Sequence, residues 1–199
     1  MISLSRRGVR LEHERYEEIK ADIIDLFEEC DVHHYPLDVF NIAAQLHYRV
    51  IPYSALPELK RMQCRLLSQD GCSELVYNSS THMYEYNIYY NDSLGIVQSR
   101  IYFTILHEIG HIRLGHLDYD SDKTDIIKES EANFYAGYII APPPLVGRFS
   151  CRSPRELGRR FNTSSEAADY AYDRYLKWLS CGRYYKDYEI HLLELFGVA

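Results

Sequence analysis

The chain lacks any apolar run that could cross a bilayer, since no stretch approaches about 18 consecutive apolar residues. Residues 1–13 contain basic side chains, but no apolar segment of about 7 to 15 residues follows them. The start of the chain therefore does not have the pattern of a secretory signal. We expect a cytoplasmic protein that does not associate with membranes.

Cysteine is scarce and has no metal-binding pattern. The number of cysteines is odd and none forms a C-x-x-C pair, which argues against a disulfide framework and against a structural zinc site. We predict packing or surface thiols in a reducing compartment at all five positions: Cys30, Cys64, Cys72, Cys151 and Cys181.

Positive charge is also in short supply. The 22 lysine and arginine residues are outnumbered by 29 aspartate and glutamate residues, which gives a formal net charge of −7. The basic residues are scattered, whereas binding to phosphate groups needs clustered lysine and arginine. We therefore expect no direct binding to nucleic acid. With 46% hydrophobic and 26% charged residues, the composition is that of an ordinary globular protein.

Two amphipathic helices are expected near the start of the chain. Apolar residues recur at helical spacing over residues 14–30. A second helix is predicted after Pro36, a residue suited to the first turn of a helix, with Val39, Ile42 and Leu46 on its buried face.

Residues that favour β-structure predict a small sheet of about three strands. Residues 48–53 have an alternating pattern of side chains with β-branched residues in the middle, which predicts a short strand. Residues 72–77 and 83–90 are separated by the polar residues 78–81, a pattern typical of an antiparallel hairpin. Gly71 is expected to mark a turn before this hairpin.

The rest of the chain is predicted to be mainly helical. One helix is expected over residues 98–115, where the final glycine suits the left-handed position after a helix. The prolines at 142–144 must end the following helix, because proline lacks the backbone donor. Thr163 and Glu166 have the spacing of a capping box. Further helices are expected over residues 58–67, 124–141, 154–161, 164–179 and 187–196.

The segment H-E-I-G-H at residues 107–111 lies on the helix predicted over residues 98–115. Residues four apart lie on one face of a helix, so His107 and His111 can bind one metal ion while Glu108 reaches a water molecule there. A catalytic zinc site usually has three protein ligands and one open position, so one ligand remains to be found. The candidates farther along the chain are His116, Glu129 and Glu131.

Register distinguishes these candidates. The metzincin pattern H-E-x-x-H-x-x-G-x-x-H is not met, because Gly115 falls one residue late and His116 one residue early. We expect His116 to cap the helix end or face solvent. Glu129 and Asn133 are four apart, so one helix face can present a carboxylate to the metal and an amide to the free N–H of a histidine. Glu131 points about 200° away from Glu129, so both cannot be ligands. We favour Glu129, as in the gluzincins, with Glu131 as the alternative.

A longer pattern surrounds these residues. Residues 103–116 read F-T-I-L-H-E-I-G-H-I-R-L-G-H, residues 129–136 read E-S-E-A-N-F-Y-A, and a proline follows at 142. These motifs strongly resemble the ImmA/IrrE family of metallopeptidases. Residues 36–50 and 157–168 are also similar to segments of that family.

The resemblance implies a zincin-like α+β fold. A small, mostly antiparallel sheet of about three strands would pack on the H-E-x-x-H helix, and a helical region would follow. We predict a metallopeptidase domain over residues 1–145 and a helical C-terminal subdomain over residues 146–199, with a soft boundary between them.

The resemblance also implies a zinc-dependent intracellular endopeptidase. Zn²⁺ would be held by His107, His111 and Glu129, with Asn133 behind a histidine ligand and Glu108 as the general base. A tyrosine or His116 would suit the stabilisation of the oxyanion.

The expected substrate is a partner regulatory protein. Relatives are often encoded near a helix-turn-helix repressor that they cleave in response to stress or mobile-element signals. Because this chain has no room for such a domain before Tyr16, we expect the repressor to be a separate protein. The competing interpretation is a regulator that binds a repressor without cleaving it, and a third is a zinc hydrolase acting on a non-peptide bond.

Overall fold

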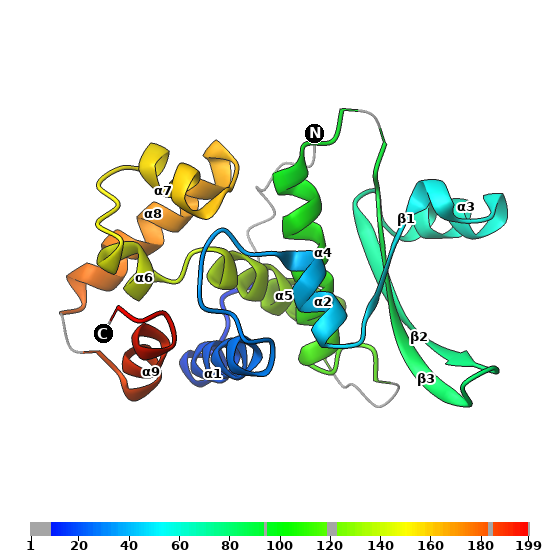
Figure 1. Cartoon of the computed structure of the whole chain (residues 1–199), viewed down its shortest axis with the longest axis horizontal. Coiled ribbons are helices and arrows are strands. Elements are labelled where there is room, and N and C mark those ends of the chain that lie inside the picture. Colours follow the sequence, from blue (N-terminus) through cyan, green and yellow to red (C-terminus); the bar gives the residue numbers. More distant parts are fainter. Residues whose placement is uncertain (1–8, 94, 119–122, 183–184, 199) are drawn as a thin grey trace.

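A three-stranded mixed sheet lies at one end of the molecule, and helices make up most of the remainder (Figure 1). The computed structural model describes residues 9–93, 95–118, 123–182 and 185–198. The arrangement is α+β, as predicted.

Two helices begin the described chain. α1 (His13–Glu29) confirms the first predicted helix. α2 (Val39–Gln45) confirms the second, but the placement of Pro36 in its first turn is wrong. The Asp38 side chain caps this helix by accepting a hydrogen bond from the Asn41 amide at 3.0 Å, so the helix begins after the proline.

The sheet contains β1 (Arg49–Pro52), β2 (Gly71–Asn78) and β3 (Met83–Tyr90), in the order β1-β3-β2. β2 and β3 form the predicted antiparallel hairpin, whereas β1 runs parallel to β3. Gly71 does not mark a turn but begins β2. A Cβ atom there would lie 2.7 Å from the Tyr89 carbonyl oxygen and 2.4 Å from the Thr104 methyl carbon. The glycine therefore allows close packing at the strand end.

Helices cover both faces of this sheet. A short 3₁₀ turn, η1 (Tyr53–Ala55), and α3 (Glu58–Leu67) pack on one face, around a small core of Tyr53, Cys64 and Tyr89. The histidine-bearing helix α4 (Gln98–Arg113) packs against β2 and β3, where Ile88 is fully buried. Neighbouring residues of β3 thus face opposite cores, as the period of a strand requires.

The remaining helices follow the predicted order, with one addition. They are α5 (Asp125–Ile140), α6 (Pro143–Arg148), α7 (Pro154–Phe161), α8 (Ser165–Ser180) and α9 (Asp187–Leu195). α6 was not predicted, because the prolines that end α5 also occupy the first turn of a new helix. The predicted capping box with Thr163 is wrong: Ser164 caps α8 by accepting a hydrogen bond from the Ala167 amide.

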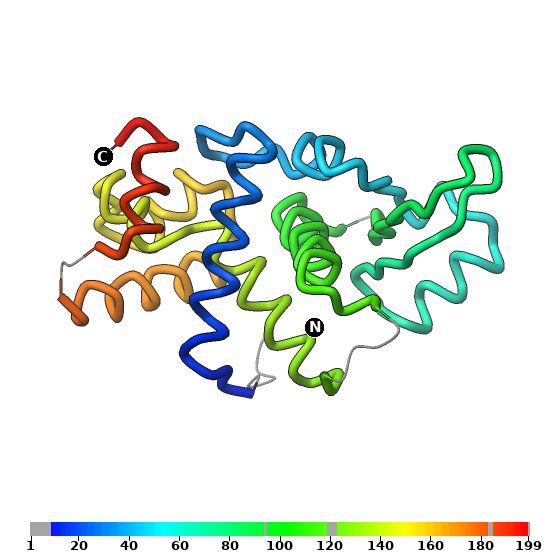
Figure 2. Tube along the Cα trace, turned by 90° about the horizontal axis from the view of Figure 1, so that it is seen from below, coloured from blue at the N-terminus to red at the C-terminus, as the bar shows by residue number. Residues whose placement is uncertain are grey.

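One apolar core joins the two halves of the described chain. Figure 2 shows α1 running between the C-terminal helices and α5, and it contacts both α5 and α9. The Tyr35 ring packs against Phe161 at 4.7 Å and Phe196 at 5.3 Å between ring centroids. Residues buried before and after residue 145 belong to this core, and the boundary there stays a prediction.

Two further findings concern the helices and the cysteines. Within the described residues, no helix combines the length and apolarity needed to span a bilayer. All five cysteines are free thiols, as predicted, and three of them are buried: Cys30, Cys64 and Cys151.

Candidate metal centre

The site lies where α4 meets α5. Ile105 and Ile109 form the fully buried back of α4, which leaves the histidines on another face. Gly110 faces α5, and a Cβ atom there would lie 3.0 Å from the Cβ of Tyr135, a fully buried residue. The glycine therefore lets the two helices approach closely enough for a side chain of α5 to reach the histidines of α4.

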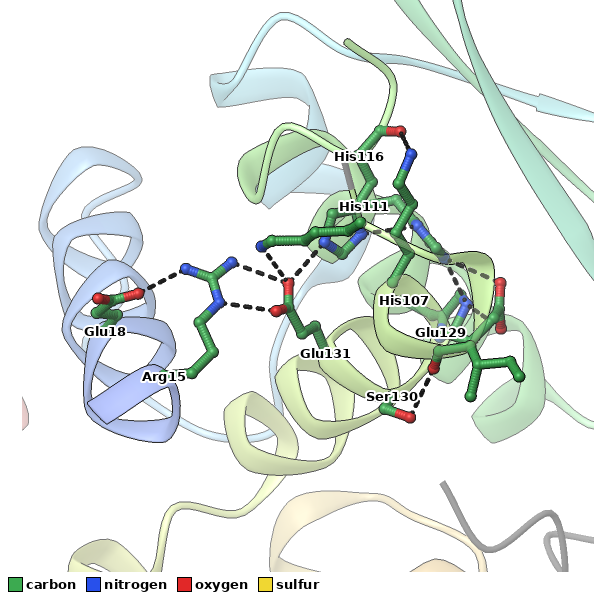
Figure 3. Close-up of polar contacts among 11 residues, drawn as sticks. Arg15, Glu18, His107, His111, His116, Glu129, Ser130 and Glu131 are labelled. Atoms are coloured by element: carbon green, nitrogen blue, oxygen red, sulfur yellow. Dashed lines mark hydrogen bonds and ion pairs between the residues drawn. The ribbon is translucent and has the colours of Figure 1, made fainter. Parts of the chain in front are cut away.

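Three of the predicted residues converge at this crossing (Figure 3). The Nε2 atoms of His107 and His111 lie 3.1 Å apart. The Glu129 carboxylate approaches them from α5, with Oε2 at 3.6 Å from His107 Nε2 and Oε1 at 3.4 Å from His111 Nε2. Two imidazole nitrogens and a carboxylate form a donor set typical of catalytic zinc.

The spacing of these donor atoms fits a metal ion. Tetrahedral bonds of about 2.0 Å place neighbouring ligand atoms about 3.3 Å apart, which is close to the three distances above. The histidine side chains are mostly buried, with 15% of His107 and 12% of His111 exposed, whereas 57% of the Glu129 side chain is exposed. The centre is therefore accessible from the Glu129 side.

The charges within the group are complementary. Hydrogen bonds from His107 and His111 hold the pKa of the Glu129 carboxyl far below its usual range. Burial lowers the pKa of His107, but the Glu129 and Glu108 carboxylates outweigh it and the pKa is raised. This cluster of negative charge attracts a proton in the absence of a cation, and it would attract a metal cation for the same reason.

Glu108, the predicted general base, points from α4 toward the sheet and is buried. Its Oε2 accepts a hydrogen bond of 2.7 Å from the Ser73 hydroxyl on β2. Ser73 pairs with Ile88, on the face of the sheet that α4 covers. Sequence reasoning placed Ser73 on a strand but had no signal for this contact, because residues 35 positions apart meet only in the fold.

Asn133 lies one turn beyond Glu129 on α5 and is exposed. Its side chain contributes to the raised pKa of His107. The predicted bond from Asn133 to the free N–H of a histidine stays a prediction, and the buried Nδ1 of His107 has no hydrogen-bond partner among the described residues. The stacked ring of Phe103, at 6.3 Å between centroids, packs against His107 instead.

The placement of His116 at a helix end facing solvent or capping carbonyls is wrong. It is buried behind His111, where its Nδ1 lies 3.0 Å from His111 Nδ1. Its Nε2 lies 2.8 Å from the Oε2 of Glu131. Because His116 lies on the side of His111 away from Glu129 and His107, it is not placed to stabilise an oxyanion.

Glu131 does not belong to the group of His107, His111 and Glu129, in agreement with the predicted opposite directions of Glu129 and Glu131. It is buried and accepts hydrogen bonds from Arg15 of α1 (Figure 3). It also accepts a hydrogen bond from Lys123. Burial raises the pKa of the Glu131 carboxyl, but these cations and His116 lower it to about 2. Burial also lowers the pKa of His116, to about 4, so this ring is neutral near neutral pH.

The helices that carry the site are also tied together at its back. Arg113, in the last turn of α4, donates to the Asp22 carboxylate of α1 at 2.9 Å. The Tyr135 hydroxyl of α5 donates to the same carboxylate at 2.9 Å. Asp22 therefore connects the two helices that supply the donor atoms.

A histidine pair with a facing glutamate, carried by crossed helices beside a small sheet, is the arrangement of a zincin-type metallopeptidase. Residues 61–172 match the model of the peptidase family described as the IrrE N-terminal-like domain. This match covers more than half of the chain, which belongs to the ImmA/IrrE family of metallopeptidases. No curated protein matches the chain.

Proposed function

We propose that the protein is a zinc-dependent endopeptidase of the cytoplasm that cleaves a partner regulatory protein. The observation that carries this proposal is the convergence of His107, His111 and Glu129 at distances that suit one tetrahedral ion. Family membership gives the coarser function, that of a metallopeptidase, and implies a metal.

Different residues of the site have different roles in the proposed peptide hydrolysis. A zinc ion bound by the three ligands would polarise the scissile carbonyl and lower the pKa of water. Glu108 accepts a proton from the attacking water and passes it to the leaving amine. The Ser73 hydroxyl donates a hydrogen bond to Oε2 of Glu108 and so orients the carboxylate.

The position of β2 supports an extended polypeptide as the substrate. β2 pairs with β3 on one side only, so its other edge has no strand partner in the described part of the chain. A segment of a substrate can add to such an edge through backbone hydrogen bonds. Ser73 joins this strand to Glu108, which brings the edge close to the general base. We propose a helix-turn-helix repressor as the protein that supplies this segment.

Cleavage is tested with a helix-turn-helix repressor from the same genome, chosen from the adjacent genes where they encode one. The wild-type protein and the Glu108→Gln variant are each incubated with the repressor and zinc, and the products are identified by mass spectrometry. We expect a discrete cut by the wild type and a loss of rate of at least about 100-fold in the variant. The variant keeps all three proposed ligands and is expected to bind zinc as the wild type does.

The other outcomes are informative. Equal cutting by both proteins would mean that Glu108 is not the base. Tight binding to the repressor without cutting by either protein would favour a regulator that acts without cleavage.

Metal binding is tested by removing one ligand. His111→Ala, purified in parallel with the wild type, is analysed for metal by inductively coupled plasma mass spectrometry. We expect about one zinc per wild-type chain and almost none in the variant, because a site with two remaining ligands binds zinc weakly. If the wild type contains another metal, the proposal that the metal is zinc is wrong. If His111→Ala contains as much zinc as the wild type, the proposed ligand set is wrong.

A further inference from the structure

A second, buried group of polar side chains lies directly behind the proposed metal ligands. His116, with 1% of its side chain exposed, lies between the ligand His111 and Glu131, with 2% of its side chain exposed. Polar groups buried to this degree are costly to leave unpaired, so each ring nitrogen of His116 needs a defined partner.

In the series His111, His116 and Glu131, the proposed metal ligand His111 sets the direction of the hydrogen bonds. His111 directs Nε2 toward Glu129, so binding a metal there requires an unprotonated Nε2 and a proton on Nδ1. That Nδ1–H group then donates to Nδ1 of His116 at 3.0 Å. His116 must accept at Nδ1, which places its own proton on Nε2.

The carboxylate end requires the same direction. Nε2–H of His116 donates to Oε2 of Glu131 at 2.8 Å. Arg15 donates two hydrogen bonds of 2.9 Å to the Glu131 carboxylate, and Lys123 donates one of 2.8 Å. Surrounded by these cations, Glu131 is an acceptor only. Both ends therefore select one tautomer of each histidine.

The other histidine ligand has no such support. The buried Nδ1 of His107 has no hydrogen-bond partner within the described residues, and the ring is packed against Phe103. The two ligands thus differ at Nδ1: this atom of His107 has no hydrogen-bond partner among the described residues, whereas the contact with His116 fixes both the orientation and the proton of His111.

We propose that His116 and Glu131 are positioning residues, which fix His111 in the tautomer that presents Nε2 to the metal. The inference rests on the proposed metal site. A polar group that orients a histidine ligand usually changes metal affinity by about 10- to 100-fold when removed. Here a second histidine carries this effect from a carboxylate that does not contact the ligand itself.

Three substitutions separate positioning from packing. His116→Leu fills much of the space but accepts no hydrogen bond. His116→Gln keeps the order of the two partners, because its amide oxygen can accept from His111 and its amide nitrogen can donate to Glu131. Glu131→Gln removes the charge that selects the tautomer. Glu189→Gln is the matched control, since Glu189 is another buried carboxylate, bonded to Trp178 at 2.7 Å and remote from the histidines.

Zinc affinity is measured by competition with a chromophoric chelator. We expect a loss of about 10- to 100-fold for His116→Leu and for Glu131→Gln, and an affinity close to that of the wild type for His116→Gln and Glu189→Gln. Losses of the same size in Glu189→Gln, or in both His116 variants, would mean that the effect is one of stability or packing and would overturn the proposal.

A second measurement needs no metal. Nitrogen-15 NMR of the metal-free wild-type protein at neutral pH is expected to show His111 protonated at Nδ1 and His116 protonated at Nε2. In Glu131→Gln this preference should weaken while the fold is retained. A His111 ring that carries no proton on Nδ1 in the wild type would overturn the proposal. If instead the tautomers are as expected but zinc does not bind, the proposed function fails while the positioning geometry stands.

Discussion

Single residues decide how closely the two halves of the metal site approach each other. Gly110 is neither the proposed base nor a proposed ligand. It faces Tyr135 of α5, and a Cβ atom at position 110 would lie only 3.0 Å from the Tyr135 Cβ, so Tyr135 would have to shift. The Tyr135 atom concerned is Cβ, which cannot move without its backbone. The glycine in H-E-I-G-H is therefore explained by packing between helices.

Gly110→Ala is expected to push α5 away from α4. The added carbon would lie 3.0 Å from Tyr135 Cβ, so Glu129 would be displaced from the histidines. Overpacking of this kind costs about 1 to 3 kcal/mol, although alanine favours a helix more than glycine. Urea unfolding should show lower stability, and chelator competition should show weaker zinc binding.

Gly158→Ala in α7 is the matched control for this change. Its Cβ would meet Ala168 Cβ at 3.4 Å and the Thr163 carbonyl oxygen at 3.5 Å, which are ordinary contacts. This variant should be as stable as the wild type or more so, and its zinc affinity should be unchanged. Zinc binding by Gly110→Ala equal to that of this control would contradict the packing explanation.

Ion pairs connect helices that are distant in the sequence. Glu17 of α1 accepts a hydrogen bond of 2.7 Å from Lys20 and one of 2.6 Å from Lys186, the residue before α9. Burial raises the pKa of Glu17, but the two lysines outweigh this effect and lower it to about 2. This cluster links the N-terminal helix to the last one.

The sign of the pH dependence of this cluster follows from its lowered pKa. The stabilisation by Glu17 is present above about pH 4.5, and it is lost as the pH falls toward 2, where the folded protein also binds the proton. We expect Glu17→Gln to lower the free energy of unfolding by about 2 kcal/mol at pH 7. Urea unfolding between pH 7 and pH 2.5 should show the two proteins converging.

Glu14→Gln is the control, because Glu14 is exposed on the same helix. Its unfolding free energy should follow that of the wild type across the pH range. A constant difference between Glu17→Gln and the wild type down to pH 2.5 would contradict the ionic explanation.

Elements whose signals are local were predicted well. α3 and α7 begin and end at the predicted residues, since the signals that mark them, including a proline at or just before the first turn, are local in the sequence. α6 was missed because Pro142 to Pro144 read as a break, whereas Pro143 occupies the first turn of a helix. Because proline both ends a helix and suits the first turn of the next one, the sequence alone does not distinguish the two cases.

Contacts between segments that are distant in the sequence limited the prediction of the site. Spacing within α4 and α5 led us to favour His107, His111 and Glu129, with Glu131 as the alternative, because each pattern lies on one helix. The environment of Glu131 was not accessible in this way, since its partner Arg15 is 116 residues away and on another helix. A buried carboxylate and a solvated one look the same in a sequence until the neighbouring helix is placed.

The contacts of Arg15 and Asp22 determine how long a fragment must be to keep the metal site supported. The segment that matches the family model begins at residue 61, whereas Arg15 and Asp22, which contact Glu131 and Arg113, belong to α1. A fragment cut to residues 61–172 would keep every proposed ligand and the general base. It would also leave Glu131 without its bidentate cation and α4 and α5 without their shared carboxylate. We therefore expect a stable fragment with an intact metal site to extend beyond residues 61–172 and to include α1.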